Sequence, residues 1–143
     1  MKIAYKLVLF FCLLAFQHLQ AQSSTQTIRF SNLKNRAGKL YIGWYNSEAD
    51  FMQPAKSVYE KFVEVTGKDS LDIPFEGIKP GIYAVSVFFD LNDNATLDKN
   101  GFGIPKEPYG FSNNVLPLTR PASFEESRFE VKEADTLQVI RLK

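Results

Sequence analysis

The order of apolar and polar residues along this chain is that of a protein built from short β-strands. Residues 81–90 give the clearest signal, because Tyr83, Val85, Val87 and Phe89 alternate with a second set of residues that is also largely apolar. A strand with two apolar faces is typical of the centre of a sheet. Six other segments have the composition or the alternation of strands, namely residues 27–33, 39–45, 58–65, 71–75, 124–131 and 136–142.

Seven short strands without a convincing helical period predict one all-β domain, a β-sandwich of the immunoglobulin-like or transthyretin-like type. Residues 35–38 form the expected turn between the first two strands, and residues 132–135 are expected to join the last two as a closing hairpin. Tyr83 follows a Pro80-Gly81 turn. That position suits either a tyrosine corner, in which the hydroxyl bonds to upstream backbone, or an ordinary core tyrosine.

The first 21 residues have the features of a secretory signal peptide. Lys2 and Lys6 precede an apolar run at residues 7–16, and Ala21 offers a small residue for cleavage. This run is too short to cross a bilayer as a helix, so we expect no transmembrane anchor. We expect export to the periplasm or the extracellular space, with residues 22–143 as the mature domain.

Cleavage after Ala21 would also remove the only cysteine, Cys12, and the only histidine, His18. The mature domain then lacks a thiol nucleophile, a histidine base and the Cys or His ligands that zinc prefers. Loss of Lys2 and Lys6 changes the formal net charge from +1 to −1. A nearly neutral domain gives no electrostatic reason to expect nucleic acid or anionic lipid as a partner.

Residues 91–123 form a long segment without a strand pattern and are rich in Gly, Pro and Asn. Loops of this length in a compact domain are usually functional or disordered. Phe102, Tyr109 and Phe111 argue for order, because a solvated segment rarely carries so many groups that burial would stabilise. The aromatic residues of this loop either line a shallow ligand site, or Phe102, Ile104 and Phe111 fold back to close one end of the sandwich, and the second alternative is favoured.

Oxygen-bearing groups at alternate positions make the start of this loop a candidate calcium site. Asp90, Asn92 and Asn94 are followed by the Thr96 carbonyl and by Asp98, in the spacing of the first five ligands of the familiar calcium loop. Calcium needs six to eight oxygen ligands, and alternate positions in a tight loop point several of them inward at once. Ca²⁺ is therefore the one candidate cofactor.

Two departures weaken this match. Ala95 stands where that loop has a glycine, and Gly101 stands where it has a bidentate glutamate, although Glu107 is available to complete the ligand set. A site of this kind would be weak, with a Kd on the order of 10⁻⁴ to 10⁻³ M. In the favoured alternative, the same Asp and Asn side chains cap turns by bonding to the local backbone.

Three motifs in this region resemble a known bacterial family. They read Ile78-x-Pro80-Gly81-x-Tyr83, Phe89-Asp90-x-Asn92-x-Asn94-x-x-Leu97-Asp98 and Phe102-Gly103-Ile104-Pro105-x-Glu107-x-Tyr109-Gly110-Phe111. Together they resemble the family catalogued as domain of unknown function 2141, over residues 27–142. The resemblance implies an exported bacterial β-sandwich with a signal peptide and no established activity, and it supplies no catalytic residues. Members commonly have glycine at the position of Ala95.

The function expected from these features is a non-catalytic binding or structural module of the bacterial envelope. Its working surface would be the loop at residues 90–114, and its partner an envelope or extracellular protein or a glycan. One alternative is a carbohydrate-binding module in which exposed Trp44, Tyr45 or Tyr109 stacks on sugar rings. The alternation of residues 39–45 favours a core position for Trp44 instead.

A second and less favoured alternative is a small glycan hydrolase. Such enzymes place two carboxylates on either side of a cleft, and Asp98 with Glu107 is the candidate pair. A domain of 122 residues offers little room for a cleft, and acid pairs are common in any chain with 16 acidic residues. We therefore expect no catalytic residues.

Overall fold

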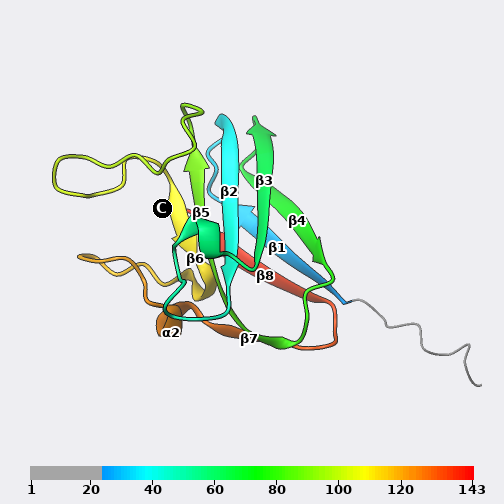
Figure 1. Cartoon of the computed structure of the whole chain (residues 1–143). Helices are drawn as coiled ribbons and strands as arrows, with labels where there is room; N and C mark the ends of the chain where they lie inside the picture. The colour runs from blue at the N-terminus through cyan, green and yellow to red at the C-terminus, as the bar shows by residue number, and fades with distance from the viewer. Residues whose placement is uncertain (1–23) are drawn as a thin grey trace, which may run out of the picture.

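The computed structural model describes residues 24–143, which form two packed β-sheets (Figure 1). The predicted signal peptide, with Cys12 and His18, lies outside these residues. The eight strands of the described chain are β1 (Thr25–Ser31), β2 (Ala37–Tyr45), β3 (Tyr59–Thr66), β4 (Ser70–Glu76), β5 (Gly81–Asp90), β6 (Tyr109–Phe111), β7 (Phe129–Val131) and β8 (Thr136–Arg141). Three short helical turns accompany them, η2 (Pro54–Lys56), η3 (Ser112–Asn114) and α2 (Phe124–Ser127). Within residues 24–143, no helix has both the length and the apolar character needed to span a membrane.

The two sheets differ in size and in strand direction. The smaller sheet has the order β4-β1-β8, in which β1 is antiparallel to β4 and parallel to β8. The larger sheet has the order β3-β2-β5-β6, with β7 also paired to β5. β5 therefore lies at the centre of the larger sheet, as its two apolar faces predict.

The core lies between the two sheets and is built by the alternation along each strand. In β2, Leu40, Ile42 and Trp44 point inward and are almost fully buried. The Trp44 ring packs against the rings of Phe75 and Tyr83, at centroid distances of 5.2 and 5.8 Å. Trp44 is 1% exposed, which confirms the core position and removes it from the candidate sugar-binding residues.

The all-β prediction is confirmed, but three details of the predicted strands are wrong. The long loop contains an additional strand, β6, so the described chain has eight strands instead of seven. Residues 124–127 are helical because Ser123 and Glu126 form a capping box, in which each side chain accepts the backbone N–H of the other. β7 and β8 form no hairpin, because β7 pairs with β5 and β8 pairs with β1 in the other sheet.

Tyr83 makes the hydrogen bond of a tyrosine corner. Its hydroxyl donates to the backbone carbonyl of Lys79 at 3.0 Å, while its ring is 6% exposed and belongs to the core. Tyr83 is therefore both a core residue and the tyrosine of a tyrosine corner. The bond ties the turn before β5 to the body of the sandwich.

Replacing Tyr83 with Phe should lower the free energy of unfolding by about 1 kcal/mol, because the Lys79 carbonyl loses a partly buried partner. The matched control is Tyr41→Phe, since the Tyr41 ring lies on the outer face of the sheet and outside the core. Urea unfolding of both variants measures the difference. Equal effects at the two positions would contradict a structural role for the Tyr83 bond.

Candidate functional site

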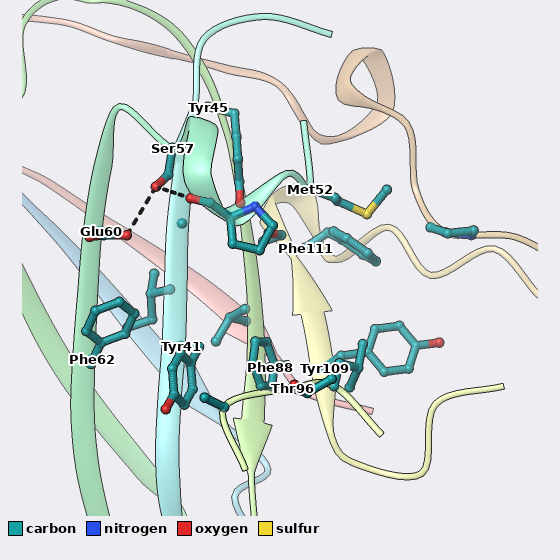
Figure 2. Close-up of a pocket in the computed structure, with 18 of the residues that line it drawn as sticks. Tyr41, Tyr45, Met52, Ser57, Glu60, Phe62, Phe88, Thr96, Tyr109 and Phe111 are labelled. Carbon is teal, nitrogen blue, oxygen red and sulfur yellow. Dashed lines mark hydrogen bonds between the residues drawn. The ribbon is translucent and has the colours of Figure 1, made fainter. Parts of the chain in front are cut away.

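The outer face of the larger sheet carries a row of aromatic side chains. The strand register places Phe62 of β3 opposite Tyr41 of β2, Tyr41 opposite Phe88 of β5, and Phe88 opposite Tyr109 of β6. Figure 2 shows these four side chains next to one another across the strands. The row arises because the residues of β2 that alternate with Leu40 and Ile42 must point away from the core.

The rings of this row, which we call the aromatic row, are close enough to interact. Tyr41 and Phe88 are stacked, with centroids 4.8 Å apart and an interplanar angle of 7°. Tyr41 and Phe62 are tilted, with centroids 5.0 Å apart. Phe62 is 57% exposed. Contiguous apolar surface of this kind on a soluble domain is characteristic of binding sites.

The next outward-facing row of the register combines two polar residues with a glycine and an aromatic residue. It consists of Glu60, Gly43, Ser86 and Phe111. A Cβ atom at Gly43 would lie 2.7 Å from the Tyr45 hydroxyl oxygen, so only glycine leaves room for the Tyr45 ring above this position. Tyr45 is 3% exposed, so its ring is not available to stack on a sugar as the carbohydrate-binding alternative expects.

Several hydrogen-bonding groups gather around this second row. The Ser57 hydroxyl lies 3.0 Å from the Pro54 carbonyl and 3.4 Å from the Glu60 carboxylate (Figure 2). Burial raises the pKa of the Tyr45 phenol above its ordinary value, a bond with Ser86 acts in the opposite direction, and the charge of Glu60 adds to the rise. Tyr45 therefore stays protonated and able to donate at neutral pH.

Two loops wall the site and make it a groove. Met52 and Pro54 come from the connection between β2 and β3, and residues 95–97 with Lys99 come from the long loop. The groove has a volume of about 620 Å³, within the range of small-ligand sites. The groove is lined mainly by carbon and has a few convergent polar groups, which is the usual composition of such sites.

The aromatic residues of the long loop have three different positions. Phe111 is 5% exposed and packs with Tyr45 and Phe51 in a second apolar cluster, separate from the core between the sheets, and it also borders the groove. Tyr109 is half-buried and borders the groove. Phe102 is 92% exposed and takes part in neither arrangement.

The Asp90 carboxylate caps the start of the long loop. It is fully buried and accepts the backbone N–H groups of Asn92, Asp93, Asn94 and Ala95 at 2.8 to 3.4 Å. Burial raises the pKa of Asp90, but the four N–H groups outweigh it and hold the pKa below its ordinary value. The charge is thus satisfied by the backbone of the loop itself.

Glu107 and Asp98 close the same loop from its other end. Glu107 is 7% exposed, and its two oxygens accept the backbone N–H groups of Leu91 at 2.8 Å and Asp98 at 3.0 Å. The Asp98 carboxylate accepts the side-chain amides of Asn92 at 2.8 Å and Asn94 at 3.1 Å. Each carboxylate in the loop therefore has hydrogen-bond donors as partners.

These bonds are the ones that the turn-capping alternative predicts. The Asn94 side-chain oxygen is also engaged, because it accepts the N–H of Thr96 at 2.8 Å. Over residues 24–143, no three His, Cys, Asp or Glu side chains are grouped so that they could hold a metal ion. The structure brings the proposed calcium ligands into one loop, and calcium binding stays a prediction.

A comparison with known protein families identifies the family of this chain. A family model described as "Uncharacterized protein conserved in bacteria (DUF2141)" matches residues 28–138. The chain belongs to this family. No curated protein and no solved structure matches the chain.

The groove of this DUF2141 domain contains residues that the sequence motifs do not single out. Tyr41, Phe62 and Phe88 form its floor, whereas the loop residues drew attention because of their oxygens. The alternation of residues does indicate the outward-facing rings. Residues 81–90 are apolar on both faces, and residues 39–45 have an aromatic residue facing away from the core. What the sequence lacks is the register that makes these rings neighbours.

Replacing Asp90 with Ala should lower the free energy of unfolding of this DUF2141 domain by about 2–4 kcal/mol, because four N–H groups lose their acceptor. Asp90→Asn should cost less, since its amide oxygen can still accept the bonds made to Oδ1. Thermal melts in millimolar Ca²⁺ and in chelator measure both variants. The capping role predicts equal losses in the two solutions, whereas a stabilisation of the wild type by Ca²⁺ that Asp90→Ala abolishes would favour the calcium site.

Replacing Ala95 with Gly should raise the free energy of unfolding by about 0.5–1 kcal/mol. Ala95 has φ of 59°, in the left-handed region where a Cβ atom is unfavourable and glycine is not. Ala37→Gly is the control, because Ala37 begins β2 without a positive φ and should lose stability. A loss at both positions would contradict the strain at Ala95.

Proposed function

We propose that this chain is an exported, non-catalytic binding domain of the bacterial envelope, and that it binds a neutral oligosaccharide in the groove on the larger sheet. The observation that carries the proposal is the aromatic row, with Tyr41 stacked on Phe88 and Phe62 open to solvent. Sugar rings have apolar faces of C–H groups, which pack on the electron-rich faces of aromatic rings. A row of such rings fits a ligand that repeats the same apolar face along its length.

The polar row beside the aromatic rings supports a sugar over a purely apolar ligand. Glu60 offers an acceptor, and Ser57 offers a hydroxyl. Sugar hydroxyls donate and accept, so they match a mixed set of this kind. The charged residues of the groove are Glu60 and Lys99, which balance and favour a neutral ligand.

Cross-strand aromatic pairs also stabilise sheets, so the row has a structural contribution of its own. Two features support the proposal that the row also binds a ligand. Phe62 leaves more than half of its surface in water, where it adds little to stability, and the two walling loops enclose a volume that a flat stabilising patch does not need. The proposal therefore rests on the combination of the aromatic row with a groove walled by two loops.

The remaining parts of the proposal have separate support. Lys2, Lys6 and the apolar run at residues 7–16 favour export. The two packed sheets and the Tyr83 bond to Lys79 favour an immunoglobulin-like or transthyretin-like class of sandwich. A non-catalytic role is favoured because both oxygens of Glu107 are bonded to backbone N–H groups and are not free to serve as an acid or base.

The proposal predicts that Phe62→Ala and Tyr41→Ala each weaken binding of a neutral β-1,4-linked tetrasaccharide by about tenfold. The probes are tetramers of glucose and of N-acetylglucosamine, whose equatorial hydroxyls leave extended apolar faces. Isothermal titration calorimetry measures the Kd, and thermal melts show whether each variant is folded. Phe102→Ala is the matched control, because Phe102 is equally aromatic, 92% exposed and outside this groove.

Two results would contradict the proposal. The first is that the wild-type protein binds neither tetramer at millimolar concentration. The second is that Phe102→Ala weakens binding as much as Phe62→Ala does, since the ligand would then lie on the long loop and not on the sheet.

A further inference from the structure

A second surface lies on two loops that project from the same side of the sandwich. Figure 1 shows residues 97–106 and residues 115–121 extending to the left, away from the start of β1. A cleft of about 720 Å³ lies between them. Its composition differs from that of the groove on the sheet.

The projecting loops carry apolar side chains at their tips. Phe102 and Leu118 are each 92% exposed, and Ile104 is 59% exposed. These are the largest exposures among the large apolar residues of the described chain. Apolar groups that protrude on convex tips cannot be covered by a flat partner, so they need either matching pockets or a medium that deforms around them.

Positive charge surrounds these tips. The cleft is lined by Lys34, Arg36, Lys99, Lys106, Arg120 and Lys143. Its one acidic residue is Glu107, whose carboxylate is bonded to backbone N–H groups. Arg120 is paired with Glu126 at 2.7 Å, and the ion pairs found within residues 24–143 involve none of the other five cations. The chain as a whole is nearly neutral, so this positive charge is local.

We propose that this face, formed by the two loops and their cations, docks on a lipid bilayer that contains anionic phospholipid. Phe102 and Leu118 enter the boundary between headgroups and acyl chains, and the lysines and arginines pair with the lipid phosphates. Charge complementarity selects an anionic partner, and the protruding apolar tips select a fluid bilayer over a rigid protein surface. The proposal is independent of the oligosaccharide groove.

Vesicle flotation of the protein purified from an exporting bacterial host tests this proposal. Vesicles made of equal parts phosphatidylglycerol and phosphatidylcholine should carry the protein upward, and vesicles of pure phosphatidylcholine should not. Phe102→Ser and Leu118→Ser should each reduce the partition coefficient about tenfold. Lys99→Gln and Lys106→Gln should each reduce it about fivefold, with the effect strongest at low salt.

The matched control is Phe62→Ala, which removes an exposed aromatic ring from the sheet face and should leave vesicle binding unchanged. All substituted side chains are exposed or lie on the cleft surface, and thermal melts check that each variant is folded. Because Phe62→Ala acts on the groove and Phe102→Ser on the loop tips, failure of one proposal leaves the other intact.

Three outcomes would overturn the proposal. The first is unchanged binding to mixed vesicles after the double change Phe102→Ser with Leu118→Ser. The protein would then adsorb through its charge alone, without insertion of the apolar tips. Equal binding to both kinds of vesicle would show that the cations do not contribute to binding. Binding of poly-glutamate in preference to mixed vesicles would point to an acidic protein partner instead of a bilayer.

Discussion

The folding of the long loop depends on one buried charge, the Asp90 carboxylate at the end of the central strand. An ionised side chain without exposed surface is unfavourable unless donors surround it, and here the backbone N–H groups of the next residues supply them. The chain must therefore turn tightly as soon as β5 ends. Glu107 then bonds to Leu91 and Asp98, which fixes the two ends of the turn against each other. The segment that these carboxylates hold in place supplies one wall of the groove and one of the two projecting loops.

A second constraint is the period of two in the strands, which gives the larger sheet an inner and an outer face. Trp44 and its neighbours in β2 fill the core, so Tyr41 has to face outward. Its partners across the sheet are Phe62 and Phe88, and Tyr109 lies opposite Phe88, so four strands contribute one ring each to the same row. The groove thus follows from the register that buries the core. A shift of one residue in the strand register would remove both the groove and the buried core.

The sequence predicts the all-β class and six of the strands to within about two residues, because alternation reports which residues face a core. It also identifies the capping carboxylates, since Asp90, Asn92 and Asn94 have few favourable positions other than a turn or a metal site. It does not reveal the pairing of β8 with β1, or that three residues, Tyr109–Phe111, suffice for a strand on β5. Partner choice is a property of the whole fold, and for the same reason the aromatic row could not be found before the register was known.

Hydrogen bonds also fix the backbone at the tip of the long loop. The Asn100 side chain accepts the backbone N–H groups of Phe102 and Ile104 at 2.9 and 3.1 Å, and the Asn100 N–H donates to the Ile104 carbonyl at 2.9 Å. A tip fixed in this way loses little conformational entropy when it is covered, so more of the burial of Phe102 contributes to binding. Leu97 and Lys99 border both the groove and the basic cleft. The proposed bilayer contact would consequently hold the groove beside the membrane surface.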